Sequence, residues 1–138
     1  MAQRYGGLSL PSPRKTSDLK NDSRFLSIYD YVLNSSVLSG GTSISISDLP
    51  TGAIVTRVEL RVNTAFKTST TAQHDIEVTN ANGTVVLMDN TWNDPNVVGN
   101  YSTECYHVIS GAIKVTHDLK YMTAGSAILR FYVYEITS

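Results

Sequence analysis

Residues 49–66 read LPTGAIVTRVELRVNTAF, the stretch of the chain in which one periodicity runs longest. Its even positions carry the apolar side chains Ile54, Val58, Leu60, Val62 and Phe66, and its odd positions carry Arg57, Glu59, Arg61 and Asn63. Successive side chains of a β-strand point to opposite faces, so this period of two predicts a strand with one buried and one solvated face. Pro50 and Gly52 are turn residues and place the start of the strand near Ala53.

The same run, Leu-Pro-x-Gly-Ala-x-Val-Thr-x-Val-x-Leu-x-Val-x-Thr-Ala-Phe, resembles a strand of small β-sandwich proteins in tailed-bacteriophage particles, among them capsid decoration (cement) proteins. The likeness covers residues 48–66, about a seventh of the chain, and contains no catalytic motif. It implies a β-sandwich that works in a virion, and it assigns no functional residues.

Further strand-like segments occur along the chain, and their spacing predicts an all-β protein with a single antiparallel β-sandwich, jelly roll-like, behind an extended N-terminal arm. These segments are residues 24–33, 42–47, 73–79, 84–88, 104–109, 112–116 and 127–136. Asn82-Gly83 lies between two alternating runs and predicts a hairpin, because both residues tolerate positive φ. Lys67–Ala72 is expected to be an exposed loop, and Lys120–Gly125 a connection.

The first and last strands are expected to be apolar on both faces. Residues 24–33 have Leu26, Ile28 and Val32 on one side and Phe25, Tyr29, Tyr31 and Leu33 on the other. Residues 127–136 have Leu129, Phe131 and Val133 on one side and Ile128, Arg130, Tyr132, Tyr134 and Ile136 on the other. Tyrosine offers apolar area with a polar tip, so Tyr29, Tyr31, Tyr132 and Tyr134 are candidates for subunit contacts.

Composition divides the chain into an N-terminal arm, residues 1–23, and a sandwich domain, residues 24–138. Residues 1–24 hold five basic and two acidic residues, a net charge of +3, whereas the other 114 residues hold six basic and ten acidic ones, a net charge of −4. The arm could lie on its own domain, remain solvated or dock on a partner subunit, and the last is preferred. Its candidate contact residues are Arg4, Tyr5, Leu8, Leu10, Arg14 and Lys15. Nucleic acid is disfavoured because Tyr5 is the only aromatic residue of the arm.

The irregular segment 89–101 holds Trp92, the only tryptophan, together with Tyr101, several asparagines and two aspartates. An aromatic face beside amide and carboxylate groups could bind a sugar, and the loop is therefore a candidate ligand site. The preferred interpretation is that Trp92 pins the loop to the edge of the sandwich.

No spacing in the chain supports catalysis, and we expect no catalytic residues, no cofactor and no metal site. His74, His107 and His117 have no shared short spacing and are expected to be separate surface histidines. Asp75 and Glu77 are interpreted as a solvated row on one strand face. Cys105 is the only cysteine, so it forms no internal disulfide, and it is interpreted as a half-buried strand residue rather than a nucleophile.

The sequence therefore predicts a non-enzymatic phage structural protein, made in the host cytoplasm and held on the capsid surface of the virion as a decoration protein. Its expected partners are the major capsid protein or another virion protein, and copies of itself in a homo-oligomer, with a trimer favoured. Nucleic acid is not an expected partner, for the reason given for the arm. A membrane is not expected either, since no apolar run reaches the ~20 residues that span a bilayer. The alternatives are a neck, tail or head-fibre component, and a carbohydrate- or receptor-binding β-sandwich.

Overall fold

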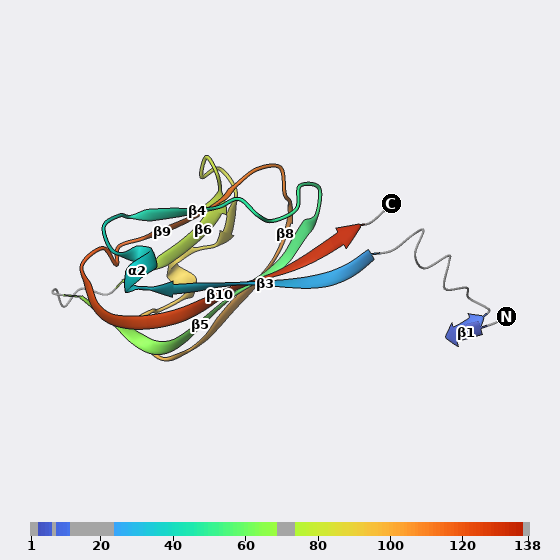
Figure 1. Cartoon of the computed structure of the whole chain (residues 1–138), viewed down its shortest axis with the longest axis horizontal. Helices are drawn as coiled ribbons and strands as arrows, with labels where there is room; N and C mark the ends of the chain where they lie inside the picture. Colours follow the sequence, from blue (N-terminus) through green and yellow to red (C-terminus); the bar gives the residue numbers. More distant parts are fainter. Residues whose placement is uncertain (1–2, 7, 12–23, 69–73, 137–138) are drawn as a thin grey trace.

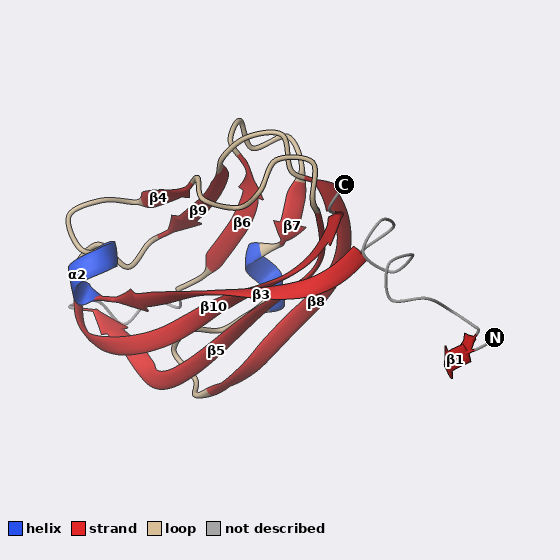
Figure 2. Cartoon of the chain, turned by 45° about the vertical axis from the view of Figure 1, so that its right-hand side comes forward, coloured by secondary structure: helices blue, strands red, loops and turns tan. Residues whose placement is uncertain are grey.

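Two four-stranded antiparallel sheets packed face to face form the body of the protein (Figures 1 and 2). The computed structural model describes residues 3–6, 8–11, 24–68 and 74–136. The strands of the body are β3 (Arg24–Asn34), β4 (Ser43–Ile46), β5 (Ile54–Thr68), β6 (Ile76–Asn80), β7 (Val86–Met88), β8 (Gly99–Val108), β9 (Ile113–His117) and β10 (Met122–Ile136). A short helix, α2 (Ser35–Leu38), follows β3, and a 3-10 turn, η1 (Asn90–Trp92), follows β7.

The strand order is that of a jelly roll. One sheet runs β3-β10-β5-β8 and the other runs β4-β9-β6-β7, and all pairs are antiparallel. Both sheets thus take strands from the beginning, middle and end of the body, the interleaving that a double-sheet jelly roll requires. The all-β sandwich predicted from the sequence is confirmed, with the same eight segments as strands.

The core lies between the inner faces of the two sheets. The alternating apolar residues of β5 and β10, including Leu60, Val62, Phe131 and Val133, are buried there, and they meet buried residues of β6 and β9. The ring of Phe131 lies edge-on to Tyr31 of β3, with the ring centroids 5.8 Å apart. Burial of these rows supplies the main driving force for folding, since each large apolar side chain contributes about 1.5–3 kcal/mol.

A β-bulge corrects the prediction that Ile54 shares the buried face of β5. Tyr132 pairs with Arg57, but the next residue of β10, Val133, pairs with Val55, so β5 holds one extra residue at this point. The extra residue reverses which side chains of β5 point towards the core on the two sides of the bulge. Val55 is therefore buried, whereas Ile54 is only partly buried and pairs with Tyr134.

Two strands begin earlier than the sequence predicts. β8 begins at Gly99 rather than Glu104, and β10 begins at Met122 rather than Ala127. The first half of β8 carries polar residues on its exposed face, and the first half of β10 contains Gly125 and three register shifts. Neither half has the regular apolar pattern by which a strand is recognised in sequence.

The predicted hairpin at Asn82-Gly83 joins β6 to β7. Residues 81–85 separate the two strands, so the connection is longer than a two-residue turn. Gly83 has φ of 77°, and the side chain of Asn80 accepts a hydrogen bond from Val85 N at 3.0 Å.

Lys67 and Thr68, expected in a loop, instead extend β5, and the rest of that predicted loop lies outside the described residues.

The N-terminal region contains a small sheet of its own. β1 (Gln3–Gly6) pairs antiparallel with β2 (Leu8–Pro11), apart from both sheets of the sandwich (Figure 1). This hairpin was not anticipated from the sequence. Residues 12–23 lie outside the described part of the chain, so the division into an arm and a domain at residue 23 stays a prediction.

Candidate interaction surface

The outer face of the β3-β10-β5-β8 sheet is the face turned away from the core, and it holds the most conspicuous exposed apolar groups of the body. Strand register places its side chains in rows that cross the sheet. The row nearest the start of β3 consists of Leu26, Tyr134, Ile54 and Val108, each paired with the next. Leu26, Tyr134 and Val108 are 53%, 41% and 48% exposed. An apolar row that crosses a whole sheet in contact with solvent indicates a binding surface.

The middle of the outer face is polar and internally paired. Arg130 makes two hydrogen bonds to the Asp30 carboxylate, at 2.7 and 2.9 Å. This pairing lowers the pKa of Asp30 and raises that of Arg130. Glu59 is only 7% exposed and accepts a hydrogen bond from the Tyr132 hydroxyl at 3.2 Å. Asp30 and Arg130 thus pair with each other, and Glu59 is held by the Tyr132 hydroxyl.

Arg57 completes the polar region. Its guanidinium lies over the Tyr132 ring, 5.3 Å from the centroid, and Nη2 donates to the Ser102 hydroxyl. Arg57, Glu59 and Arg61 share the outer face as predicted, but the expectation that this row is solvated is wrong for Glu59. The burial of Glu59 could not be foreseen, because it depends on neighbours from β10.

The apolar surface continues along β3. Leu26, Ile28 and Val32 alternate on the outer side of this strand, and each is more than half exposed. The predicted two-faced character of β3 is thereby confirmed: Leu33 is fully buried on the inner side, and Tyr29 and Tyr31 pack against the core. β3 is also an edge strand, because the sheet order ends with it.

The outer face includes an open pocket lined by Leu26, Thr56, Arg57, Glu104, Cys105 and Tyr132. Burial raises the pKa of the Cys105 thiol to about 11, so the thiol remains protonated at neutral pH and is a poor nucleophile. The sulfur lies 3.6 Å from the carbonyl oxygen of Val55. The arrangement suits packing better than covalent chemistry.

The four candidate interface tyrosines lie on two different surfaces. Tyr132 and Tyr134 belong to the outer face, whereas Tyr29 and Tyr31 lie on the inner side at the open edge between β3 and β4. Tyr29 donates to Glu135 at 3.0 Å and Tyr31 donates to Asp48 at 2.6 Å. Burial and these carboxylates raise the pKa of both phenols. The role of the four residues in subunit contacts stays a prediction.

The candidate arm residues are only partly described. Arg4 and Tyr5 lie in β1, and Leu8 and Leu10 lie in β2. Arg14 and Lys15 lie outside the described residues.

The loop after β7 is anchored by asparagine rather than by tryptophan. Asn93, 5% exposed, accepts from Ile76 N at 3.1 Å and donates to Ile76 O at 2.7 Å. Trp92 is 53% exposed, which contradicts the expectation that it pins the loop. Tyr101 lies in β8, where its ring packs against the core and its hydroxyl donates to Val97 O. The candidate ligand pair is thus one exposed and one half-buried aromatic residue.

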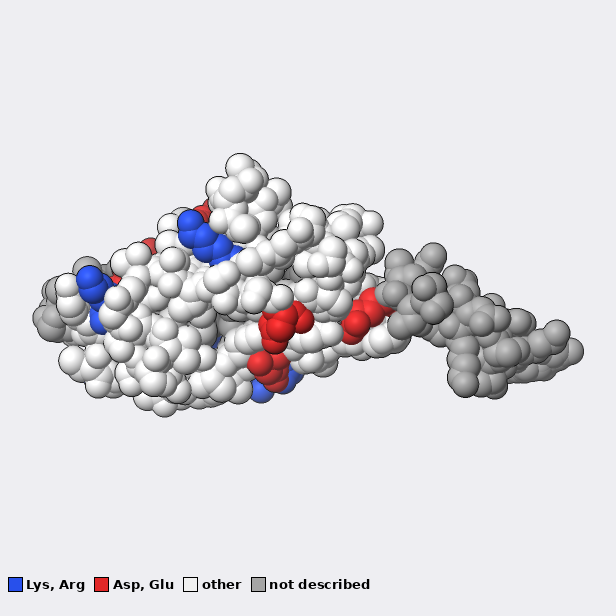
Figure 3. All heavy atoms as spheres, turned by 45° about the horizontal axis from the view of Figure 1, so that its top comes forward, with Lys and Arg blue, Asp and Glu red and all other residues white. Residues whose placement is uncertain are grey.

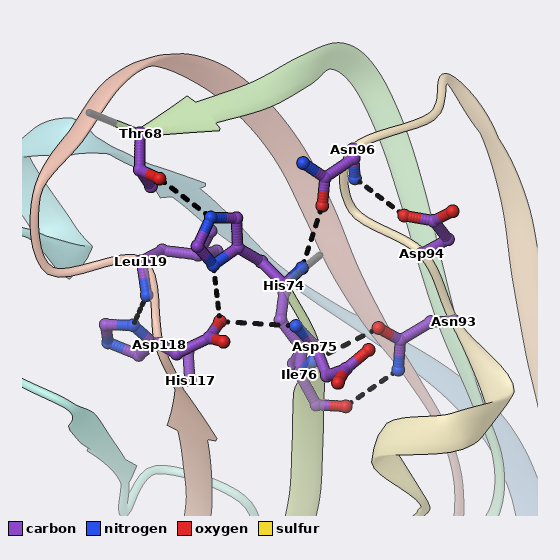
Figure 4. A network of polar contacts seen from close by, with 10 residues as sticks. All are labelled: Thr68, His74, Asp75, Ile76, Asn93, Asp94, Asn96, His117, Asp118 and Leu119. Atoms are coloured by element: carbon purple, nitrogen blue, oxygen red, sulfur yellow. Dashed lines mark hydrogen bonds and ion pairs between the residues drawn. The ribbon is translucent and has the colours of Figure 1, made fainter. Parts of the chain in front are cut away.

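A polar cluster surrounds His74 where β6 begins (Figure 4). His74 Nδ1 lies 3.2 Å from Asp118 Oδ1, and Nε2 lies 2.7 Å from the Thr68 hydroxyl. Asn96 accepts a hydrogen bond from His74 N. His74 and His117 are 5% and 4% exposed, so the prediction of surface histidines is wrong for both. Both histidines have polar neighbours in the sequence, which is typical of exposed strand ends. Their rings are buried only because other segments of the chain pack over them.

The cluster holds carboxylates close together. Burial and the neighbouring carboxylates of Asp118 and Asp94 raise the pKa of Asp75. Burial lowers the pKa of His117, whose Nδ1 accepts from Leu119 N at 3.0 Å. Among the residues that the structure describes, no three or more His, Cys, Asp or Glu side chains are arranged to hold a metal ion.

Charge is scattered over the side of the molecule seen in Figure 3, where isolated basic and acidic groups interrupt a mostly uncharged surface. This view contains no continuous basic stripe of the kind that follows a nucleic-acid backbone. Within the described ranges, no helix has both the length and the apolar character to cross a membrane.

Comparison with solved structures finds the same kind of fold in other proteins at low sequence identity. A chain from the acid-stable capsid of Helicobacter pylori bacteriophage KHP30 is 14% identical with a TM-score of 0.50, and the match covers 83% of this chain and 90% of that one. A chain of the Bacillus endospore appendages, which are disulfide-linked pili, is 11% identical with a TM-score of 0.52, over 85% and 91% of the two chains.

A chain of the capsid asymmetric unit of cyanophage Pam1 is 12% identical with a TM-score of 0.49, over 83% of this chain and 86% of that one. No protein-family model matches the sequence. No curated protein matches it either. At these identities the likeness concerns the fold alone.

Proposed function

We propose that this chain is a non-enzymatic structural protein of a tailed-bacteriophage particle, and that it decorates and stabilises the outer surface of the head. The observation that carries the proposal is the exposed apolar surface of the β3-β10-β5-β8 sheet, beside a central polar region whose groups contact one another. Such a surface is made for contact with another protein.

Two further observations support a virion role. The run at residues 48–66 resembles a strand of phage β-sandwich proteins, and the fold is shared with a chain of the KHP30 capsid. Jelly rolls are common in viral capsid domains, although a fold alone does not define a function.

The proposed mechanism is the addition of many weak contacts over a repeating lattice. The sandwich lies on the head surface, and the basic arm reaches over a neighbouring capsid subunit with Leu8 and Leu10 as apolar contacts. Residues 1–24 carry a net charge of +3 and residues 25–138 one of −4, so the arm suits an acidic surface. Repetition makes even a small gain per copy significant for a shell under internal pressure.

Truncation of the arm tests this mechanism. Particles that lack the chain are incubated with the full-length protein or with a variant deleted for residues 2–20, and bound copies are counted by quantitative mass spectrometry. We expect the truncated protein to fold and to occupy few sites. A matched control replaces Arg4, Arg14 and Lys15 by Gln, which separates charge from length. Unchanged occupancy of the truncated protein would remove the arm from the mechanism.

Copy number distinguishes head decoration from a neck, tail or head-fibre role. Decoration requires hundreds of copies in each purified particle, because the head lattice repeats its sites many times. A handful of copies would place the chain in the neck, tail or fibre and overturn the decoration proposal.

The exposure of Trp92 favours a second candidate, a carbohydrate-binding or receptor-binding sandwich. Trp92 is 53% exposed, two positions after Asn90, on a loop that Asn93 already anchors. Trp92→Ala should therefore leave the fold intact. Loss of binding to host glycans or cells with normal particle occupancy would favour this candidate, whereas unchanged cell binding would exclude it. Val97→Ala, on the same loop and similarly exposed, is the matched control.

A further inference from the structure

The free edge of β3 is long and unprotected: β3 has 11 residues, whereas the edge strands β4 and β7 of the other sheet have 4 and 3. β3 pairs with β10 over eleven consecutive residues without a register shift, and in the described part of the chain no strand pairs with its other side. A free edge presents unpaired N–H and C=O groups to any strand that approaches.

Natural edge strands carry features that prevent such pairing, and β3 lacks them. Residues 24–34 contain no proline, no lysine and no bulge. Their single acidic residue, Asp30, is held on the sheet by two hydrogen bonds from Arg130. Proline, lysine and bulges are the usual protective devices of edges.

β8, the other edge of the same sheet, differs in character. Most of its exposed row is polar, with Asn100, Ser102 and Glu104, and its pairing with β5 contains a register shift. The exposed row of β3 consists of Leu26, Ile28 and Val32 around the neutralised Asp30. Of the two edges of this sheet, the β3 edge is therefore the one suited to an apolar partner strand.

We propose that the occupant of this edge is β3 of a second copy of the chain, paired antiparallel about a two-fold axis at Tyr29. This register overlaps all eleven residues of both strands. It places Leu26 opposite Val32 of the second copy and Ile28 opposite Asp30 of the second copy. The two Asp30 carboxylates therefore do not lie opposite each other. The two four-stranded sheets join into one continuous sheet of eight strands.

The symmetry follows from the pairing. A strand that pairs antiparallel with its own copy uses the same edge on both subunits, so the contact closes after two copies. The trimer expected from the sequence would need a different surface. An eleven-residue edge is about 37 Å long, which gives a contact at the small end of specific interfaces. The dimer is therefore concentration-dependent, and its formation does not depend on the proposed role in a virion.

Cysteine cross-linking tests the register. In a Cys105→Ser background, the double variant Leu26→Cys/Val32→Cys places two pairs of thiols opposite each other across the axis. Opposed residues of antiparallel strands have Cα atoms about 4.5–5.5 Å apart, a distance that a disulfide spans. Residues 26 and 32 of one chain are about 20 Å apart along the strand and cannot bond to each other. We expect mild oxidation to give a covalent dimer.

Each single variant and a matched double variant on the other edge serve as controls. Asn100→Cys/Tyr106→Cys has the same six-residue separation on exposed positions of β8. We expect all three to remain largely uncross-linked. Cross-linking of the β8 variant to the same extent as the β3 variant would show random collision and would overturn the proposal.

Light scattering of the unmodified chain over a hundred-fold range of concentration provides an independent measurement. We expect a shift from monomer to dimer, abolished by Val32→Glu and retained in Ser102→Glu. A monomer at every concentration, or a trimer insensitive to Val32→Glu, would overturn the proposal. The outcome leaves the copy-number test of the virion role unaffected.

Discussion

Gly125 shows how a single residue without a side chain permits the core to close. Its φ is +133°, a conformation that side chains strongly disfavour, and it lies where β10 passes the buried ring of Phe66. A Cβ at this position would lie 2.4 Å from Phe66 Cδ1 and 2.8 Å from Phe66 Cα. Because part of this clash is with backbone, no rotation of the ring relieves it.

Gly125→Ala is therefore expected to destabilise the protein severely, by at least about 2 kcal/mol, through overpacking and backbone strain. The measurement is the free energy of unfolding in urea. Gly111→Ala is the matched control, since a Cβ there meets nothing within 4 Å. Equal stability of the two variants would contradict the close packing of Gly125 on Phe66.

Asp75 lowers the stability of the folded protein at neutral pH, because its neighbours disfavour its negative charge. Its pKa is raised in the folded state above the ordinary value of 3.8 by burial and by Asp118 and Asp94. A carboxyl group with a raised pKa costs stability above its folded pKa, and the cost disappears below its unfolded pKa. Asp75→Asn should therefore increase the free energy of unfolding at pH 7, with a gain that shrinks as the pH falls towards 3.8.

Asp30→Asn is the control of opposite sign for this pH series. Arg130 lowers the pKa of Asp30, so the pair stabilises the fold above pH 3.8, and this stabilisation is lost as the pH falls through the folded pKa. The variant should be less stable than the parent at pH 7 and equal to it in strong acid. The effect should be small, since exposed ion pairs contribute about 0–1 kcal/mol. A stability loss in Asp75→Asn at pH 7 would contradict the crowding of carboxylates around that residue.

At the scale of an element, the loop from Asp89 to Val98 owes its position to side-chain amides that replace a missing strand partner. Asn93 satisfies both the N–H and the C=O of Ile76, and Asn96 satisfies the N–H of His74. Pro95 O accepts from Phe66 N, which ties the same loop to β5. The loop therefore closes the core near the beginning of β6.

Asn93→Ala is expected to reduce the free energy of unfolding by about 2 kcal/mol, because it leaves two buried backbone groups of Ile76 without partners. Asn90→Ala, an exposed asparagine three positions earlier, is the matched control and should change stability by less than about 0.5 kcal/mol. Hydrogen exchange should show faster exchange of Ile76 N–H in Asn93→Ala alone. Similar stability of both variants would mean that the loop has another anchor.

At the scale of the whole molecule, the sandwich joins segments far apart in the chain, and the N-terminal hairpin stays separate. β3 and β10 form adjacent strands although Asp30 and Arg130 are 100 residues apart. The sheet formed by β1 and β2 shares no strand pairing with either sheet of the sandwich. The stability of the domain should therefore be independent of the arm.

A variant deleted for residues 2–20 is accordingly expected to unfold cooperatively with the same midpoint as the full chain, within about 2 °C. Differential scanning calorimetry of both proteins provides the measurement, at a concentration low enough to keep them monomeric. A fall of several degrees would show that the arm is part of the domain, and it would also weaken the interpretation of the occupancy experiment.

Local sequence patterns were sufficient to predict the strands, most of their inward and outward faces, and the opposite charges of arm and body. These properties are local: alternation with a period of two can be read from neighbouring residues, as in the two-faced strands β3 and β10. The hairpin at Asn82-Gly83 could be predicted for the same reason, because its signal lies in two adjacent turn residues.

Three features depend on long-range packing: which strands are edges, where the bulge of β5 turns Ile54 away from the core, and which polar residues are buried. Glu59, His74 and His117 lie in segments with ordinary polar surroundings, and they become buried because residues from distant segments cover them. Register between strands separated by tens of residues depends on the packing of the complete core. That packing gives β3 its free apolar edge, the feature on which the proposed dimer rests.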